Sequence, residues 1–151
     1  MVLEVQERFV RARILAVARR VTTPERLTET ISEALGPVWA FVGSRPELRP
    51  GRHVVMYIDD EMHVECGVEV ERPFASTPTG PVVCSQTLAG RVLAIAFRGP
   101  YENLPQVHQR IRGYAMDREI KLARPCWEIY GGPESDPLDP TTEIYYPIAL
   151  R

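Results

Sequence analysis

Two short segments near the C-terminal end place carboxylates beside phenols, a combination that can hold a charged ligand or move a proton. The segments are "WEIYGG" and "TEIYYP". Side chains two positions apart on a strand share a face, so Glu128 lies with Tyr130 and Glu143 with Tyr145. If the apolar residues between them pack on helices, two glutamates and two tyrosines project from neighbouring strands onto the other face. The alternative, a solvated sheet face without a ligand, stays open.

A third candidate, Tyr101, lies on the corner "RGPYENLP". Proline is tolerated in the first turn of a helix and costs about 3 kcal/mol inside it. Pro105 therefore belongs to a first turn, which predicts a helix that begins near Asn103 as its cap. Gly99 and Pro100 then form the turn that leaves the preceding strand, so Tyr101 sits at the margin of the sheet.

Other kinds of site find little support in the sequence. His63 and Cys66 are three positions apart on a predicted strand, so they point to opposite faces and do not easily share a metal ion. The G-x-S-x-G turn of a serine hydrolase and the lysine of a phosphate-binding loop are both missing. We therefore expect no metal site and no cofactor.

The elements that position the candidates follow from periodicity and turn residues. Within the stretch 5–21, Ile14, Ala16 and Ala18 alternate with Leu15, Val17 and Arg19, which favours a strand over this stretch. The segment "TTPERL" supplies Thr23 as N-cap and Pro24 at the first position of a helix that Gly43 ends. The other predicted elements are a hairpin (53–58 and 63–70), a strand at 91–97 kinked from 82–88 at Gly90, a second helix with the apolar stripe Leu104, Val107, Ile111 and Tyr114, and strands at 126–130 and 142–148.

The order strand, helix, strand, strand thus occurs twice. It predicts an α+β fold built as a tandem pair of such modules, at about 1–75 and 80–151. Glu65 and Glu143 occupy corresponding places in the two closing strands. Two modules related by a pseudo-two-fold axis would leave a cleft where they meet, and such clefts are favoured ligand sites.

Composition indicates one ordinary domain over 1–151. The 151 residues are 44% apolar and 25% charged, with a formal net charge of −2, so no basic excess suggests nucleic acid as a partner. Three scattered cysteines favour reduced thiols, and neither a signal peptide nor a membrane span is evident. We therefore expect a cytoplasmic protein that does not contact membranes.

The segments "RGPYENLP", "WEIYGGP" and "TEIYYPI" resemble the GyrI-like small-molecule-binding domain. This is the effector-binding domain of multidrug-responsive MerR-type and AraC-type transcription activators, and the family also includes gyrase-inhibitory proteins. The resemblance covers nearly the whole chain and implies the tandem strand–helix–strand–strand fold. The activators carry a helix-turn-helix domain before this module, whereas here the module begins within a few residues of Met1. We therefore expect a stand-alone member that does not itself bind DNA.

The resemblance also implies a central cleft that binds bulky, often cationic aromatic compounds, with tyrosine walls and a buried glutamate as counter-charge. A cation in a dry cleft would offset the desolvation of the carboxylate, and each stacked tyrosine would add about 0.5–2 kcal/mol. The candidate ligand-binding residues are Glu128, Glu143, Tyr145, Tyr101 and Tyr130, with Tyr57 and Trp39 as weaker matches.

The leading hypothesis is a protein that senses or sequesters a hydrophobic or cationic aromatic small molecule, and two alternatives stay open. Some stand-alone members of the superfamily resemble hydrolases that open strained cyclopropane rings of alkylating natural products. In such an enzyme one of Glu128 and Glu143 would be the general acid and the other would orient water. The acidic loop at 134–139 could instead be the DNA-mimicking surface of a gyrase-binding module.

Overall fold

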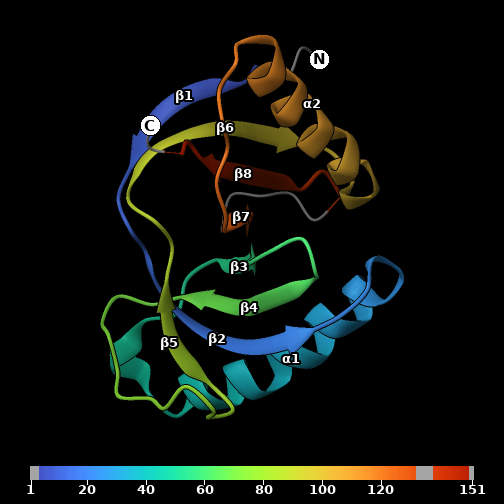
Figure 1. Cartoon of the computed structure of the whole chain (residues 1–151). Helices are drawn as coiled ribbons and strands as arrows, with labels where there is room; N and C mark the ends of the chain where they lie inside the picture. Colours follow the sequence, from blue (N-terminus) through green and yellow to red (C-terminus); the bar gives the residue numbers. More distant parts are fainter. Residues whose placement is uncertain (1–3, 132–137, 150–151) are drawn as a thin grey trace.

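The computed structural model describes residues 4–131 and 138–149. These parts of the chain form a sheet of eight strands with two helices, α1 (Leu27–Gly43) and α2 (Leu104–Asp117) (Figure 1). The predicted α+β class is confirmed. The strands are β1 (Gln6–Val10), β2 (Ile14–Val21), β3 (His53–Tyr57), β4 (His63–Glu69), β5 (Val83–Gln86), β6 (Gly90–Arg98), β7 (Cys126–Tyr130) and β8 (Thr141–Pro147).

The strand order across the sheet is β1-β6-β8-β7-β3-β4-β2-β5, and every pairing is antiparallel. Both β2-α1-β3-β4 and β6-α2-β7-β8 follow the predicted strand–helix–strand–strand order. In each, the last strand of the module lies between the other two. The modules join where β3 pairs with β7. The rotational symmetry between the modules stays a prediction.

The two outer strands are exchanged between the modules. The predicted single strand over 5–21 is wrong, because the chain breaks at 11–13 and β1 pairs with β6 whereas β2 continues to β4 and β5. The predicted kink at Gly90 is likewise a crossing from β5, at one edge of the sheet, to β6, near the other. The two crossings are tied together, since the backbone N–H of Arg13 donates to the Thr87 hydroxyl (2.8 Å) and the Thr87 N–H donates to the Arg13 carbonyl (3.0 Å).

Both helices cover one face of the sheet, which we call the helix face. Directly paired residues of antiparallel strands lie on the same face. Val38 and Val42 of α1 pack on one end of a cross-sheet row of residues, and Val107 and Ile111 of α2 pack on the other end. The row runs through Ala18, Cys66, Val55, Glu128, Ile144 and Ile95.

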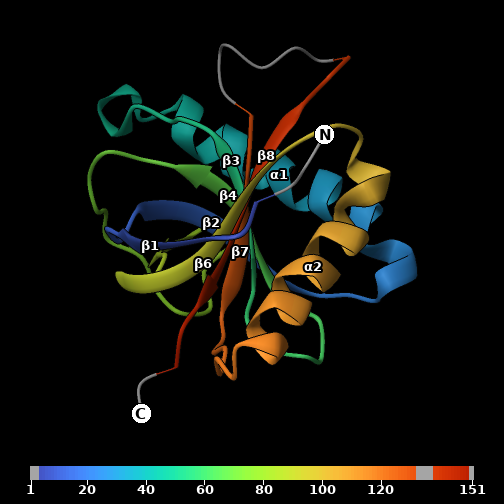
Figure 2. The ribbon, with the colours of Figure 1, turned by 90° about the horizontal axis from the view of Figure 1, so that it is seen from above.

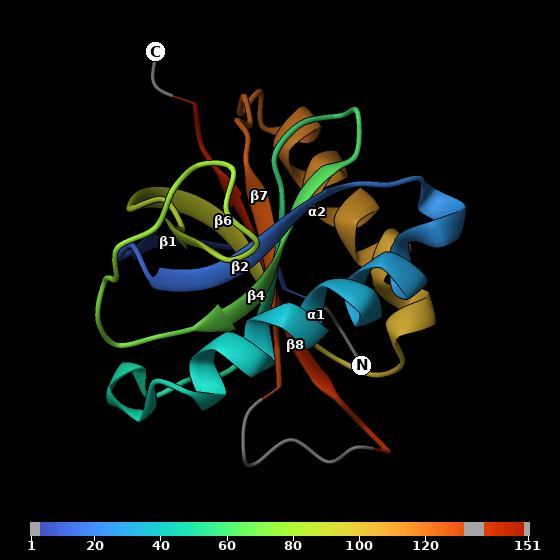
Figure 3. The same cartoon turned by 90° about the horizontal axis from the view of Figure 1, so that it is seen from below.

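The opposite face, here the second face, is also apolar and buried. Trp127 and Tyr145 stack there with ring centroids 5.5 Å apart, next to Val54, Met56 and Ile129. No described helix packs on this face. Seen from above and below, the strands twist strongly, so that β6 and β2 cross β7 at a steep angle (Figures 2 and 3). A sheet twisted in this way brings its own ends toward each other and shields its concave side.

The helix starts follow the proline positions. Asn103 is the N-cap of α2 and Pro105 lies in its first turn, as predicted, although the Asn103 side chain makes no capping hydrogen bond. Pro24 instead opens a 3₁₀ turn (Pro24–Arg26), and α1 begins three residues later. Neither of the described α-helices is long and apolar enough to cross a membrane.

Candidate functional site

A pocket of about 770 Å³ lies on the helix face between α1 and α2, above the junction of β3 and β7. This volume is within the range of ordinary small-molecule sites. Both modules contribute to its lining. Its floor contains Val55, Tyr57, Cys126, Glu128 and Tyr130. Its walls include Leu27, Ile31 and Leu35 of α1 and Leu104, His108 and Arg112 of α2. The other polar lining residues include Asp59, Asp60, Tyr101 and Arg124.

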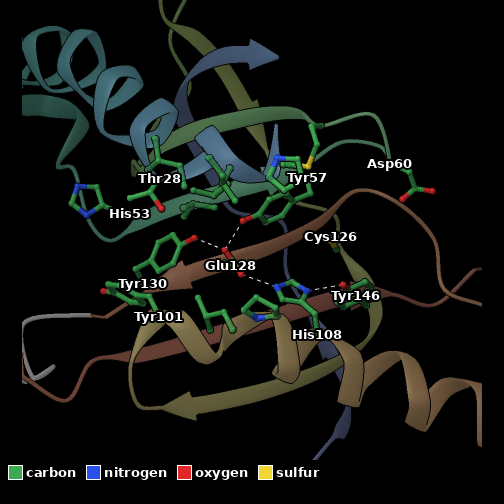
Figure 4. Close-up of a pocket in the computed structure, with 18 of the residues that line it drawn as sticks. Thr28, His53, Tyr57, Asp60, Tyr101, His108, Cys126, Glu128, Tyr130 and Tyr146 are labelled. Carbon is green, nitrogen blue, oxygen red and sulfur yellow. Dashed lines mark hydrogen bonds and ion pairs between the residues drawn. The ribbon is translucent and has the colours of Figure 1, made fainter. Parts of the chain in front are cut away.

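Glu128 is the central polar group of this floor (Figure 4). Its side chain is buried, with the residue only 2% exposed. The Tyr57 hydroxyl donates to Oε1 (2.9 Å), and the Tyr130 hydroxyl donates to the same oxygen. Nε2 of His108 lies 2.7 Å from Oε2. The carboxylate therefore meets two phenols and one imidazole, which together use three of its roughly four acceptor positions.

The hydrogen bonds continue from His108 toward solvent. Nδ1 of the imidazole lies 2.6 Å from the Tyr146 hydroxyl, which also accepts a hydrogen bond from Nη1 of Arg112 (3.1 Å). Helix α2 supplies both His108 and Arg112, one helical turn apart, so they line the same side of the pocket. The result is a connected chain of polar groups from a buried carboxylate to an exposed guanidinium.

The phenols around Glu128 hold their protons tightly. Burial raises the pKa of Tyr57 and Tyr130 well above the ordinary tyrosine value, and the nearby charge of Glu128 raises it further. Burial also raises the pKa of Tyr146 and of the Cys126 thiol. At neutral pH all four groups are therefore neutral, and Tyr57 and Tyr130 donate hydrogen bonds to the Glu128 carboxylate without cancelling its charge.

Tyr101 stands at the exposed edge of the pocket, as the corner predicts. It is 52% exposed, and its ring meets the Tyr130 ring edge-on with centroids 5.6 Å apart. The corner depends on Gly99, which has φ +153° and where a Cβ would lie 2.7 Å from the Phe97 ring. Only glycine adopts this backbone conformation readily. The turn therefore directs Tyr101 to the pocket.

The structure does not bring the two glutamates together. In the register of β7 and β8, Glu128 pairs with Ile144 whereas Glu143 pairs with Ile129. Glu128 therefore lies on the helix face and Glu143 on the second face. The prediction that both glutamates project onto one face is wrong. The pairing places odd-numbered residues of β7 opposite odd-numbered residues of β8, so the even-numbered Glu128 and the odd-numbered Glu143 lie on opposite faces.

Tyr145 follows Glu143 to the second face, where its hydroxyl donates to Oε1 of that glutamate. Nη1 of Arg52 donates to Oε2 of Glu143 (2.8 Å) and also pairs, through Nε, with Glu69 (2.9 Å). Burial alone would raise the pKa of Glu143, but the Tyr145 hydrogen bond and the Arg52 charge outweigh it and lower the pKa. This glutamate is already neutralised by a permanent cation.

Trp39 also lies outside the pocket lining. It is 41% exposed on α1, and its indole N–H donates to Nε2 of His53 (2.9 Å), which does line the pocket. Of the seven candidates, the structure thus gathers Glu128, Tyr130, Tyr57 and Tyr101 at one site. It separates Glu143, Tyr145 and Trp39 from them.

Sequence reasoning missed His108 as a site residue. Its signal was available, since it completes a helical i, i+3, i+4, i+7 pattern with Leu104, Val107 and Ile111. A titratable residue within an apolar stripe faces the interior, where it needs a polar partner. Tyr146 lies on the helix face with Ile144, but its contact with His108 depends on the packing of α2 and could not be read from spacing.

The pocket can hold an apolar body beside a buried anion. Among the described residues, no arginine or lysine forms an ion pair with Glu128. Arg124 pairs instead with Asp60 (2.5 Å). Within the same residues, no group of three or more His, Cys, Asp or Glu could hold a metal ion.

Comparison with known proteins supports the fold. No family model and no curated protein matches the sequence. The chain is similar to EcmrR in a cryo-electron microscopy structure of an EcmrR–DNA complex, with a TM-score of 0.81, 18% identity and coverage of 99% of this chain. It spans 58% of the length of that EcmrR chain. The crystal structure of the EcmrR C-terminal domain alone matches over 100% of both chains, with a TM-score of 0.76 and 17% identity.

Two further solved proteins share the fold at lower similarity. SAV2435 bound to tetraphenylphosphonium has a TM-score of 0.61 and 11% identity, covering 99% of this chain and 94% of that one. A hydrolase from Listeria innocua has a TM-score of 0.57 and 11% identity, covering 97% and 92%. The chain therefore has the fold of the EcmrR C-terminal domain, and the GyrI-like fold implied by the sequence resemblance is confirmed.

Proposed function

We propose that this protein is a GyrI-like receptor that binds an apolar aromatic cation in the pocket between α1 and α2. The observation that carries the proposal is Glu128, a buried carboxylate on the floor of an apolar pocket, held by two phenols and an imidazole. Its fold neighbour SAV2435 has been seen with tetraphenylphosphonium, which suggests the class of ligand.

The physical reason is the desolvation of the carboxylate. A buried carboxylate loses its hydration, and hydrogen bonds from neutral donors compensate for only part of that loss. An aromatic cation restores a counter-charge and buries its rings against apolar walls. Tyr57 and Tyr130 present ring surfaces next to Glu128, and Tyr101 supplies one at the edge. Cation–π contacts of this kind contribute about 0.5–2 kcal/mol each.

The hydrolase alternative in its two-carboxylate form has little support. That mechanism needs Glu128 and Glu143 in one cavity, so that one donates a proton while the other orients water. The register of β7 and β8 puts them on opposite faces of the sheet. The gyrase-binding alternative rests on the loop at 134–139, most of which lies outside the described residues.

The test is a calorimetric titration of the purified protein with tetraphenylphosphonium. We expect saturable binding at one site per chain. Glu128→Gln keeps the shape of the side chain but removes its charge and replaces one acceptor oxygen with an N–H donor, so we expect affinity to fall on the order of ten- to hundredfold.

Glu143→Gln is the matched control. It makes the same chemical change in the neighbouring strand, but on the second face, where Glu143 contacts Tyr145 and not the pocket. We expect it to leave the affinity for tetraphenylphosphonium within about twofold of the wild-type value. Equal loss of affinity in both variants, or in neither, would contradict the assignment of Glu128 as the counter-charge. Thermal melts would confirm that both variants fold.

A further inference from the structure

His108 contacts Glu128, the proposed counter-charge, directly. The attraction between Glu128 and a cation does not by itself explain why an imidazole occupies this position. Resting on the proposed function, we infer that His108 sets the charge of the pocket and thereby its choice of ligand. With a neutral imidazole the Glu128–His108 pair is anionic, and the pocket prefers aromatic cations. With a protonated imidazole the pair is neutral, and the floor of the pocket no longer distinguishes a cation from a neutral molecule of the same shape.

The hydrogen bonds provide for both states of the imidazole. Arg112 can only donate, so the Tyr146 oxygen accepts from it and the Tyr146 proton is free to point at Nδ1 of His108 (2.6 Å). Nε2–H of the neutral ring then donates to Glu128 (2.7 Å). In this state every donor along the chain has an acceptor, and Glu128 keeps its full charge.

The protonated state also has a place for each proton. When Nδ1 carries hydrogen, it donates to the Tyr146 oxygen, and the Tyr146 hydroxyl can turn its own proton away from the imidazole, toward the Cys126 sulfur in the same buried cluster. His108 and Glu128 then form a buried ion pair at 2.7 Å. The side chain of His108 is 14% exposed, so water can exchange the proton.

Other charged groups around the pocket do not change state over the range in which an imidazole titrates. Guanidinium groups keep their charge over this range, and Arg124 pairs with Asp60. Desolvation raises the pKa of Asp59, but backbone hydrogen bonds and the nearby His63 outweigh it and lower the pKa, so Asp59 stays ionised. Glu102 lies at the outer end, near Tyr101. The phenols stay neutral because their pKa values are raised.

Two other histidines need separate controls. His53 lines the pocket beside Trp39, and burial lowers its pKa, so it is neutral over most of the same range. His63 pairs with Asp59 (2.8 Å) at the exposed edge. Neither contacts Glu128, so neither can cancel its charge at hydrogen-bond distance.

The test compares two probes that differ in charge but share three phenyl rings on phosphorus: methyltriphenylphosphonium and triphenylphosphine oxide. Calorimetric titrations run from about pH 5.5 to about pH 8.5, across the ordinary histidine range. We expect phosphonium affinity to rise on the order of tenfold with pH, with a slope below one decade per pH unit, the limit for one linked proton. The affinity for the phosphine oxide should change less than about twofold.

Variants assign the effect. His108→Gln keeps an N–H donor toward Glu128 but cannot be protonated, so phosphonium binding should persist and become independent of pH. His53→Gln and His63→Gln should keep the wild-type pH dependence. If the affinity of the wild-type protein is flat with pH, or His108→Gln retains the slope, the inference is overturned while the proposed function stands. Absence of phosphonium binding at every pH overturns both.

A measurement on the wild-type protein keeps the inference testable if His108→Gln does not fold. Nuclear magnetic resonance of ¹⁵N-labelled imidazoles follows all three histidines through a pH titration. Saturating methyltriphenylphosphonium should lower the pKa of one imidazole, because a bound cation opposes a second positive charge beside Glu128. Identical titration curves with and without the probe would overturn the inference.

Discussion

Two glutamates of the same hairpin meet opposite conditions. Glu143 pairs with Arg52, a permanent cation, and with the Tyr145 hydroxyl. Glu128 receives its hydrogen bonds from phenols and an imidazole, none of which is a permanent cation. A binding site for cations needs the second condition, because a carboxylate already paired with arginine has little attraction left for a ligand.

The phenols around Glu128 predict how stability depends on alkaline pH. Their pKa values are higher in the folded protein than in the unfolded chain, so folding favours the protonated phenol. The stabilisation is fully present below about pH 10 and is lost as the pH rises through the raised folded-state values. We expect the melting temperature of the wild-type protein to fall steeply above about pH 10.

Tyr130→Phe tests this at one of the two phenols that donate to Glu128. Removing a hydrogen bond to a buried carboxylate should cost about 1.5–3 kcal/mol at neutral pH. The variant lacks the titrating phenol, so its melting temperature should fall less steeply than that of the wild type, and the two curves should converge toward about pH 11. Parallel curves in scanning calorimetry would contradict the prediction.

At the residue scale, strand parity predicted which neighbours share a face within one strand, and this held for Glu128 with Tyr130. It could not predict the register between strands, which depends on how β6, β7 and β8 pack together rather than on any local pattern. The error over Glu143 therefore has a non-local cause. His108 differs, because helical periodicity contained its position.

At the element scale, Gly67 of β4 lies against the backbone of β2. A Cβ on Gly67 would lie 1.8 Å from the Ala16 carbonyl oxygen and 2.8 Å from the Cα of Val17. Both neighbours are backbone and cannot turn away as a side chain could. The close approach of the two backbones therefore requires glycine at this position.

Gly67→Ala should therefore destabilise the protein by at least about 2 kcal/mol, as forced overpacking against backbone does. Gly113→Ala is the matched control, since this glycine lies within α2 with nothing within 4 Å of an added Cβ. Alanine there should stabilise the protein by about 0.5–1 kcal/mol. Urea denaturation of both variants measures the difference, and similar free energies of unfolding would contradict it.

The existence of most elements was predictable, because β3, β4, α2, β7 and β8 carry clear periodicity and proline or turn signals. The start of α2 at Asn103 and Pro105 follows directly from the chemistry of proline. The exchange of β1 and β5 was not predictable. The apolar residues spread over 5–21 give no sign of the break at 11–13, which is decided by pairing partners far along the chain.

At the scale of the whole molecule, the pocket belongs to both modules. Its lining combines α1 and β3 from the first with α2 and β7 from the second. A ligand that fills it therefore contacts segments from residue 24 to residue 146. A free ligand concentration of about one hundred times the dissociation constant should add about 2.7 kcal/mol to the free energy of unfolding.

Hydrogen exchange with mass spectrometry can test this joint role. Saturating tetraphenylphosphonium should slow amide exchange in peptides from both α1 and α2, because the ligand packs against each helix. Glu128→Gln at the same ligand concentration should show much weaker protection. Protection confined to one module would contradict a site shared between them.

The exchange of β1 and β5 has a mechanical consequence. Separating the modules would break the five residue pairs between β3 and β7, and also the five pairs of β1 with β6 and the four of β5 with β2. Because each module supplies a strand that pairs with the other module, opening by a hinge between them is blocked. We expect a ligand to enter past the Tyr101 corner. Binding should then shift surface loops slightly and leave the relative position of the two modules unchanged.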